Sequence, residues 1–328
     1  MKRKLRCFRY SVPLLVVVVW IYTNSSEKTF LTLYGAKIYA DRQHKVKKWI
    51  TLCDSHLRGN HRTGNHLFML AAMLHLAQLT NRTLIMPRDG WKLDRVFNLE
   101  VERYNSSIKE MCPCRTVTTP RYDYDKRFDQ AKFIREISDT NGTILFCGLS
   151  QTYKHSKVVE KELRRLLKFP AKVLHTASNI LKQSNDSKRH VNIGVHVRRG
   201  DFLLRENIGA GLTVADITYF KISFKYFTDR HKRVKFFVET DDLTWCLNNI
   251  ANTSSKAEIR FSRGAQEVDL AILSMCDAVI VSTGSFGWWG AWLARRTTVY
   301  FDGWPKKGSP LGREFRKDNY FIPEWIPL

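Results

Sequence analysis

Short apolar runs alternate with helical segments from about residue 50 to residue 301, and this alternation constrains the fold more than any other feature. Strand-like runs are predicted at residues 83–87, 144–147, 191–197, 234–238, 278–281 and 298–301. Helical periodicity lies between them, at residues 67–77, 158–167, 171–183, 216–227, 241–250, 267–275 and 286–293. Strands that alternate with helices form parallel sheets covered by helices. We therefore predict an α/β protein of the doubly wound type.

A polar segment at residues 184–189 divides this pattern in two. We predict two facing Rossmann-like domains, at residues 49–186 and 187–328. Ligands of such folds bind beyond the carboxyl ends of the parallel strands. Residues that follow the predicted strands are therefore the first candidates for a functional site.

The N-terminus predicts a membrane signal-anchor. Five basic residues precede an apolar run, in a predicted cytosolic tail at residues 1–9 and an anchor at residues 10–23. Positive charge before an apolar run keeps that end in the cytosol and sends the rest of the chain into the lumen. A cleaved signal peptide is the alternative, although Trp20, Ile21 and Tyr22 close the run in place of small residues. Residues 24–48 are polar and predict a stem.

Two further features fit a luminal address. N-x-[ST] sequons are predicted glycosylation sites at Asn24, Asn81, Asn105, Asn141, Asn185 and Asn252. Beyond Cys7 the cysteines number six, an even count that permits disulfides without fixing their pairing. Zinc binding at Cys112-Pro-Cys114 is the rival interpretation, and it lacks a second nearby Cys or His pair.

Lys and Arg number 54 against 31 Asp and Glu, an excess of +23. Nucleic acid, anionic surfaces and anionic small substrates all attract such a chain. A luminal location argues strongly against nucleic acid, and a nucleic-acid-binding module is the remaining alternative. Most of the basic residues are scattered and predict a solvated surface, so specific anion recognition must come from particular motifs.

The sharpest motif is His196-Val-Arg198-Arg199-Gly200-Asp201, at the end of the predicted strand 191–197. Arg carries a planar fork of donors that engages phosphate oxygens in pairs. Asp201 can orient one of the two guanidiniums. The motif predicts a polyanion site, and a structural Arg–Asp pair is the alternative.

Small and hydroxyl residues at 282–285 join the strand at 278–281 to an aromatic helix. Such a turn leaves backbone N–H groups free for an anion, whereas Ser285 acting as an ordinary N-cap is the competing interpretation. The Trp residues of the helix predict core packing.

A Gly- and Asn-rich loop at residues 59–66 opens the first helix and suits close approach to a ligand, or a plain turn. Neither G-x-x-x-x-G-K-[ST] nor G-x-G-x-x-G occurs in the chain, so a Walker ATPase or an NAD enzyme is not indicated.

Together these stretches resemble the α-1,2-fucosyltransferases, glycosyltransferase family 11. The resemblance lies in GVHVRRGDFL at 194–203, FFVETDDLTWC at 236–246, DLAILSMCDAVIVSTGSFGWWGAWLA at 269–294, PEWIPL at the C-terminus and the Gly64-Asn65 pair. His66 departs from the family, whose loop usually has Gln there, and the Trp-rich helix at 288–292 differs among members.

The resemblance implies a GT-B-like fold, with the acceptor on the side of residues 49–186 and GDP-fucose on the side of residues 187–328. It implies inverting transfer of L-fucose to the 2-hydroxyl of a galactose on a glycan, in a single-pass type II protein of the Golgi membrane with its catalytic domain in the lumen. No cofactor and no metal is expected, because Asp241-Asp242 is not the spaced D-x-D of metal-dependent transferases and Arg can supply the positive charge.

The resemblance also suggests roles for individual residues. Arg198 and Asp201 are the predicted catalytic residues, with Arg198 on the β-phosphate. Contacts to GDP-fucose are predicted for Gly64, Asn65, His196, Arg198, Arg199, Thr283, Ser285 and Phe286. A base for the acceptor stays unassigned among Asp201, Glu239 and Asp241. The alternatives are a fucosyltransferase with another acceptor and an inactive luminal protein that binds GDP or glycans. The nucleic-acid-binding module predicts binding to polyanions independent of GDP.

Overall fold

The computed structural model describes residues 48–105, 113–119, 121–122, 131–182, 190–255, 257–262 and 264–328. Lys47–Leu328 forms one compact unit. The predicted tail, anchor and nearly all of the predicted stem lie outside the described residues. Among the helices of the described part, none is both long enough and apolar enough to cross a bilayer.

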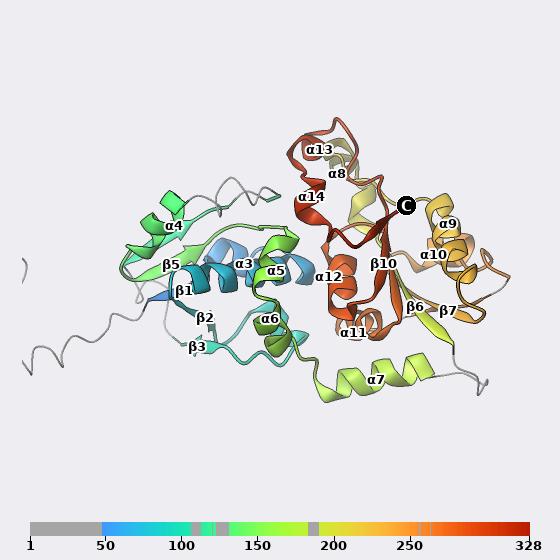
Figure 1. Cartoon of the computed structure of the whole chain (residues 1–328), viewed down its shortest axis with the longest axis horizontal. Coiled ribbons are helices and arrows are strands. Elements are labelled where there is room, and N and C mark those ends of the chain that lie inside the picture. Colours follow the sequence, from blue (N-terminus) through green and yellow to red (C-terminus); the bar gives the residue numbers. More distant parts are fainter. Residues whose placement is uncertain are drawn as a thin grey trace, which may run out of the picture. The chain divides into compact units, whose positions relative to one another are not determined.

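The first sheet has five parallel strands in the order β3-β2-β1-β5-β4 (Figure 1). The strands are β1 (Trp49–Leu52), β2 (Thr83–Pro87), β3 (Glu102–Tyr104), β4 (Cys114–Val117) and β5 (Thr143–Phe146). Only β2 and β5 are predicted from the sequence. The others are too short, or too polar, to show an apolar run.

The second sheet has six parallel strands in the order β11-β10-β9-β6-β7-β8. They are β6 (Val191–Val197), β7 (Val234–Thr240), β8 (Glu258–Phe261), β9 (Ala278–Val281), β10 (Thr297–Tyr300) and β11 (Ile326–Pro327). The four central strands match predicted runs, because strands buried on both faces are apolar throughout. The prediction of parallel α/β sheets is confirmed.

Helices connect the strands. In the first-sheet half they are α2 (Asp54–Leu57), α3 (Thr63–Leu79), η1 (Lys92–Arg95), α4 (Ala131–Ser138), α5 (Tyr153–Val158) and α6 (Glu160–Leu166). After these come α7 (Ala171–Lys182), η3 (Gly200–Leu203), α8 (Arg205–Ala210), α9 (Ile217–Thr228), α10 (Leu243–Asn249), α11 (Gln266–Met275), α12 (Ser285–Ala294), α13 (Pro310–Glu314) and α14 (Lys317–Tyr320). The helix predicted at residues 158–167 is confirmed as α6, but it begins later than predicted, and Val158 belongs to α5. Val159 leaves helical geometry (φ −103°, ψ 24°) and separates α5 from α6.

Helix α3 joins the two halves by packing against α12, and the two helices lie side by side between the sheets in Figure 1. The Phe68 ring lies 4.6 Å from the Trp288 ring and 5.2 Å from the Trp289 ring. Trp288 also donates its indole N–H to the carbonyl of Tyr320 at 2.9 Å. Because α3 is covered by its own sheet and by α12, it is buried on nearly all sides and has no polar stripe. This burial fixes the N-terminal ends of both helices next to each other.

Helix α7 lies within the range predicted for the N-terminal domain, yet it packs against the second half. Its Ala177 shares a buried cluster with Phe237 of β7 and Ala271 of α11. The polar segment at residues 184–189 lies outside the described residues. The domain limits therefore stay a prediction.

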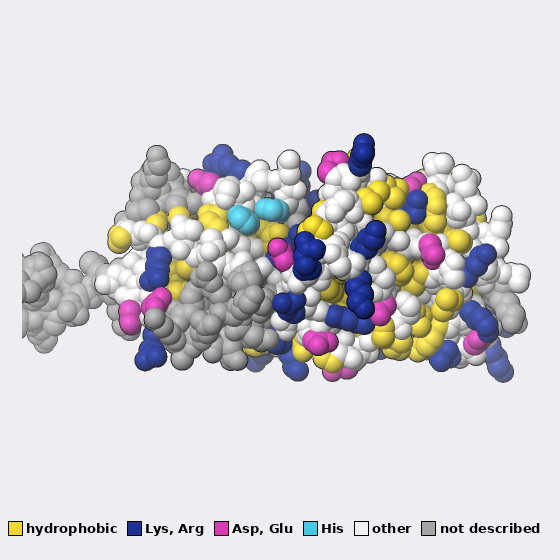
Figure 2. Space-filling model, turned by 90° about the horizontal axis from the view of Figure 1, so that it is seen from above, with side chains coloured by type: hydrophobic (Ala, Val, Ile, Leu, Met, Phe, Trp, Pro, Cys, Tyr) yellow, Lys and Arg dark blue, Asp and Glu magenta, His cyan; other side chains and the backbone are white. Residues whose placement is uncertain are grey.

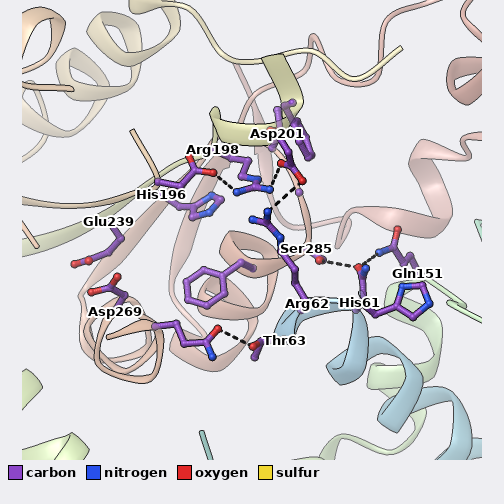
Figure 3. Close-up of a pocket in the computed structure, with 18 of the residues that line it drawn as sticks. His61, Arg62, Thr63, Gln151, His196, Arg198, Asp201, Glu239, Asp269 and Ser285 are labelled. Atoms are coloured by element: carbon purple, nitrogen blue, oxygen red, sulfur yellow. Dashed lines mark hydrogen bonds and ion pairs between the residues drawn. The ribbon is translucent and has the colours of Figure 1, made fainter. Parts of the chain in front are cut away.

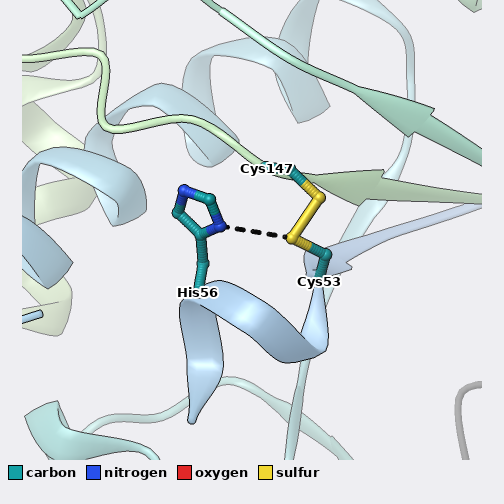
Figure 4. Close-up of side chains that lie close together, drawn as sticks. All are labelled: Cys53, His56 and Cys147. Atoms are coloured by element: carbon teal, nitrogen blue, oxygen red, sulfur yellow. Dashed lines mark hydrogen bonds between the residues drawn. A yellow bond between two sulfur atoms is a disulfide. The ribbon is translucent and has the colours of Figure 1, made fainter. Parts of the chain in front are cut away.

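A disulfide between Cys53 and Cys147 joins the ends of β1 and β5, with 5.5 Å between the two Cα atoms (Figure 4). Cys114 is disulfide-bonded as well. Cys246 and Cys276 are buried free thiols. Cys112 lies outside the described residues.

Candidate active site

A cavity of about 660 Å³ opens between the two halves, at the carboxyl ends of β6 and β7 and at the N-terminal ends of α3 and α12 (Figure 3). The motif at 196–201, the turn at 282–285 and the loop at 59–66 all contribute to its lining. Parallel strands of one sheet end at the same edge, and the packing of α3 on α12 adds the loop from the other half. The three motifs of the sequence thus meet in one place.

Arg198 is held at the centre of this lining by carboxylates on two sides. Its guanidinium donates to Asp201 and to Asp241, and its backbone N–H donates to Ser282 Oγ at 2.9 Å. The guanidinium also lies 5.1 Å from the ring of Phe202, and its side chain is 12% exposed. Burial lowers the pKa of Arg198, and the two carboxylates oppose that effect. Arg198 is therefore a fixed cation whose remaining donors face the cavity.

Arg199 points elsewhere and does not line the cavity. Its guanidinium lies 4.0 Å above the Trp245 ring and donates to Asp242 at 3.1 Å. Its backbone N–H donates to Asp241 Oδ1 at 2.8 Å. Asp242 also caps α10 by accepting from the N–H of Trp245. Arg199 ties the loop after β6 to the start of α10, and its predicted contact with GDP-fucose remains untested.

Two helix N-termini converge on the cavity. Neither Arg62 before α3 nor Gly284 before α12 caps its helix with a side chain. A Cβ on Gly64 would lie 2.6 Å from the carbonyl carbon of Ser285 and 2.8 Å from the N of Phe286, so only glycine allows the two termini to approach this closely. Uncapped N-termini carry free N–H groups and the positive ends of two helix dipoles. Their convergence beside Arg198 makes this part of the cavity an anion site.

The interpretation of Ser285 as an N-cap is wrong. Its hydroxyl donates instead to Asn65 Oδ1 at 3.1 Å, across the gap between the halves. Asn65 Oδ1 also accepts from Gln151 Nε2 at 2.7 Å. Ser285 and Asn65 are thus brought together as predicted site residues of opposite halves.

His196, Thr283 and Phe286 line the cavity near Arg198. The His196 ring packs against Gly287 and lies 5.8 Å from the Phe286 ring. Burial, with Arg198 nearby, lowers the pKa of His196 to about 3, so the ring is neutral at physiological pH. Thr283 is 2% exposed, and its hydroxyl has no hydrogen-bond partner among the described residues. That hydroxyl is free to bind a ligand.

Two acidic side chains, Glu239 and Asp269, face each other in the cavity wall beneath Arg198 (Figure 3). Burial raises the pKa of Glu239 well above its usual value, and the carboxylate of Asp269 adds to this effect. Burial also raises the pKa of Asp269. Burial and the neighbouring carboxyl group thus both favour the protonated form of Glu239. Nearby, Thr63 donates to Gln266 at 2.9 Å and links the two halves.

Arg62 adds a second guanidinium from the first half. It lies 3.3 Å from Asp201 Oδ2 and remains 63% exposed. Asp201 therefore bridges Arg198 of one half and Arg62 of the other. The exposed donors of Arg62 are available to an anion in the same cavity.

Comparison with known proteins decides the family. The sequence matches the profile described as Glycosyl transferase family 11 over residues 16–328. The chain belongs to glycosyl transferase family 11. The expected family is thereby confirmed, and so is the expectation of an enzyme at the level of the family.

Family 11 relatives include "Galactoside alpha-(1,2)-fucosyltransferase 1" of Ateles belzebuth, which is 28% identical over 273 residues. That alignment covers 81% of this chain and 72% of the relative. "Galactoside 2-alpha-L-fucosyltransferase SEC1" of Bos taurus is 27% identical, with 81% and 72% covered. Among solved structures, a mutant of FUT1 from Arabidopsis thaliana in complex with GDP has a TM-score of 0.50 at 14% identity, covering 83% of this chain and 74% of that one. The fucosyltransferase NodZ from Bradyrhizobium has a TM-score of 0.50 at 17% identity, covering 79% and 97%. These structures support the fold.

In this family 11 chain, two of the three candidates for an acceptor base are engaged, and the third is buried. Asp201 is paired with Arg198 and Arg62, and Asp241 accepts from Arg198 and from the N–H of Arg199. Glu239 is 2% exposed, and neither of its carboxylate oxygens has a hydrogen-bond partner among the described residues. Burial raises its pKa, so Glu239 holds a proton more readily than an exposed carboxylate does.

A candidate metal site fails on its chemistry. Among the described residues, one group of metal-ligating side chains lies close together, and it consists of Cys53, His56 and Cys147 (Figure 4). The two sulfur atoms are bonded to each other, and a metal needs thiolates. His56 Nδ1 lies 3.4 Å from Cys53 Sγ. Cys53 and Cys147 therefore form a disulfide beside His56, and not a metal site.

Basic residues also gather on the surface. Figure 2 shows Lys and Arg side chains around the middle of the face seen from above, with acidic groups among them. This mixture of basic and acidic side chains fits the predicted solvated surface.

The predicted glycosylation sites Asn81, Asn105, Asn141 and Asn252 are exposed, whereas Asn24 and Asn185 lie outside the described residues.

Arg62, Gln151 and Asp269 are among the lining residues that the predicted set lacks. Arg62 lies in the loop at 59–66, which the sequence analysis marked for its Gly and Asn residues. Gln151 follows β5, so the rule that ligands bind beyond strand ends could have found it. Asp269 lies inside α11, where an acidic residue looks like an ordinary surface position, and no sequence signal distinguishes it.

Proposed function

We propose that the chain transfers L-fucose from GDP-fucose to the 2-hydroxyl of a galactose residue on a glycan, with inversion. The observation that carries the proposal is the convergence of Arg198 and two uncapped helix N-termini on one cavity. Relatives of this family carry the names of galactoside α-(1,2)-fucosyltransferases, and a structural neighbour was solved with GDP. A nucleoside diphosphate sugar fits a cavity with an anion site in its middle.

Charge development explains the need for Arg198. As the bond from the fucose carbon to the β-phosphate breaks, negative charge builds up on the phosphate oxygens. A fixed guanidinium and oriented N–H groups stabilise that charge without reorganising. Asp201 and Asp241 hold the guanidinium in one orientation, and Arg62 adds a second cation. The leaving of GDP is the step that these residues accelerate.

The carboxyl groups of Glu239 and Asp269 are suited to binding a guanine base. Guanine presents an N–H and an exocyclic amine on one edge, and a carboxylate accepts from both. We assign this contact to Asp269, beside Glu239, whose pKa is raised by burial. The Asp269→Asn variant should lose discrimination between GDP and inosine diphosphate, which lacks the exocyclic amine. Unchanged discrimination would refute this assignment.

The acceptor hydroxyl needs little help from a base in this scheme. Once the bond to GDP is largely broken, the sugar carbon has oxocarbenium character and attracts even a neutral hydroxyl. Inversion requires the acceptor to approach from the face opposite GDP. The ion pairs of Asp201 and Asp241, together with the raised pKa of the buried Glu239, support a loose transition state.

We also propose that no divalent metal or cofactor takes part. The charge on the diphosphate is met by Arg198, Arg62 and the two helix N-termini. Transfer should persist in excess EDTA. Complete loss with EDTA that manganese restores would show that the charge is assigned wrongly.

The deciding experiment incubates the purified chain with GDP-fucose and a panel of galactosides, and determines the linkage in the product. A fucose on O2 of galactose supports the proposal. Transfer to another hydroxyl would favour a fucosyltransferase with a different acceptor. GDP binding without any transfer would favour an inactive luminal binding protein.

For location, we propose a Golgi protein of type II, held by the anchor at residues 10–23 with its catalytic part in the lumen. The disulfide between Cys53 and Cys147 supports an oxidising compartment, as do the exposed sequons. Sequencing the mature N-terminus tests the anchor. A mature chain that begins near Asn24 would show a cleaved signal peptide instead.

A further inference from the structure

A chain of hydrogen bonds runs along the cavity wall from Arg121 through Gln151 to Asn65. Arg121 Nε donates to Gln151 Oε1 at 2.7 Å, and Gln151 Nε2 donates to Asn65 Oδ1 at 2.7 Å (Figure 3 shows the second bond). Ser285 closes the chain from the other half by donating to the same Oδ1 atom at 3.1 Å. All four residues line the cavity.

Arg121 sets the direction of this chain. A guanidinium can only donate, so it selects the oxygen of the Gln151 amide. The nitrogen of that amide must then face Asn65, and a nitrogen donor in turn selects the oxygen of the Asn65 amide. One obligate donor therefore fixes the orientation of two amides that could otherwise flip.

Gln151 is held rigidly for this task. Its side chain is 2% exposed, and its backbone N–H donates to the carbonyl of Arg121 at 2.5 Å. Ser150 before it adopts a left-handed conformation (φ 40°) and bonds Thr119 through its hydroxyl. A non-glycine residue in that conformation needs support from its surroundings, and Thr119 provides a contact of this kind.

These hydrogen bonds determine which atoms of the Asn65 side chain are available to a ligand. Its oxygen is occupied by two donors, and its Nδ2 atom makes no hydrogen bond to any described residue. Asn65 stands at the start of α3, beside Gly64 and the N-terminal end of α12. Its two amide N–H groups therefore add to the donors of the anion site.

We propose that Gln151 is a positioning residue that turns the Asn65 amide so that its N–H groups meet the diphosphate of the donor. The proposal rests on the proposed function, because it takes the anion to be the diphosphate of GDP. Gln151 acts through Asn65, and Asn65 makes the contact. Loss of one donor to a charged group typically weakens binding about ten- to a hundredfold.

The test compares two substitutions that affect the chain in different ways. Gln151→Glu keeps the shape and can still accept from Arg121, but it presents only acceptors to Asn65 and so reverses the Asn65 amide. Gln151→Met removes the orienting donor without imposing the reverse orientation. We expect the dissociation constant of GDP, measured by calorimetry, to rise about ten- to a hundredfold in Gln151→Glu and less in Gln151→Met.

Two controls test whether the negative charge introduced by Gln151→Glu acts directly on GDP binding. Gln78→Glu makes the same change at an exposed position near the C-terminal end of α3 and should leave GDP binding unchanged. In an Asn65→Ala background there is no amide to orient, so Gln151→Glu should change GDP affinity less than about threefold. A direct charge effect would persist in that background.

The possible results distinguish failure of the proposed function from failure of the role proposed for Gln151. Wild-type chain that fails to bind GDP contradicts the proposed function itself. Wild type that binds GDP while Gln151→Glu binds it equally well overturns the role of Gln151. A loss of affinity that is as large in the Asn65→Ala background, or larger for Gln151→Met than for Gln151→Glu, also overturns it. A thermal melting point within about 2 °C of wild type for Gln151→Glu confirms that binding, and not folding, has changed.

Discussion

At the scale of single residues, Arg198 and Arg199 show how two identical neighbours acquire different environments. Side chains alternate along an extended strand, so consecutive residues at the end of β6 point to opposite sides. Arg198 points to the cavity, between Asp201 and Asp241, whereas Arg199 points to Trp245. The same side chain is thus placed for ligand binding in one case and for loop packing in the other.

This difference predicts opposite effects for matched substitutions. Arg198→Lys keeps the charge but loses the planar fork that spans two carboxylates and the ligand. We expect a loss of about 3–4 kcal/mol in transition-state stabilisation, or about 10²–10³ in kcat. Arg199→Lys should retain more activity and lose more thermal stability. Near-normal turnover by a folded Arg198→Lys variant would contradict the role given to Arg198.

The buried acid pair gives a prediction for pH. Burial raises the pKa of Glu239 well above 4.5, so the folded chain holds this proton to a higher pH than the unfolded chain does. The stability that the protonated group contributes is present at low pH, and it is lost as the pH rises through the raised pKa. Glu239→Gln stays neutral throughout. Between about pH 5 and about pH 8, the melting temperature of Glu239→Gln should therefore rise relative to wild type.

The control for this comparison is Glu324→Gln, which makes the same substitution at an exposed position. A constant difference for Glu239→Gln would show that Glu239 does not titrate with a raised pKa in the folded chain.

At the scale of elements, the geometry of the anion site depends on how closely the N-termini of α3 and α12 approach. Neither terminus is capped by a side chain, and Gly64 lies against Ser285 and Phe286. A helix N-terminus left uncapped costs stability unless a ligand or water satisfies its N–H groups. The two helices therefore keep their unsatisfied donors where an anion can use them.

The prediction at this scale concerns Gly64→Ala. The added methyl group would lie 2.5 Å from Ser285 Oγ and must push α3 away from α12. Overpacking of this kind typically costs about 1–3 kcal/mol of stability. Transfer should fall together with the melting temperature, because the donors separate.

Gly209→Ala is the matched control, because its Cβ in α8 would contact nothing within 4 Å. Alanine in a helix is typically favoured by about 0.5–1 kcal/mol over glycine, so this variant should be as stable as wild type or more stable, and active. An active and stable Gly64→Ala variant would show that the close approach is not required.

At the scale of the whole molecule, the two sheets share one continuous hydrophobic core through α3 and α12. The cavity between them is therefore set by packing that both halves contribute, including Phe68 on one side and Trp288 on the other. The disulfide between Cys53 and Cys147 adds a covalent link within the first sheet, across a separation of 94 residues.

Removing that link should cost about 2–4 kcal/mol, as for closure of a long loop. We expect Cys53→Ala, Cys147→Ala and the double variant to lose similar amounts in urea unfolding, because each change breaks the same bond. Effects of the two single variants that add up in the double variant would mean that the two cysteines act independently.

Much of the fold could be predicted from the sequence by itself, because apolar runs and helical periodicity mark the buried strands and helices. The apolar runs at β6, β7, β9 and β10 are buried on both faces, and α9, α11 and α12 follow from helical periodicity. The motif around Arg198 could be placed at a strand end for the same reason. The edge strands β3, β4, β8 and β11 escaped prediction because short or partly exposed strands need little apolar sequence.

Tertiary structure decided which further groups face the cavity beside the residues of the predicted motifs. Gln151, Asp269 and Arg62 come from three separate segments, and no spacing in the sequence relates them to Arg198. The contact of Asn65 with Ser285 spans 220 residues and depends on α3 packing against α12. Sequence periodicity reports what one element buries, whereas the meeting of two elements is set by the summed packing of both halves.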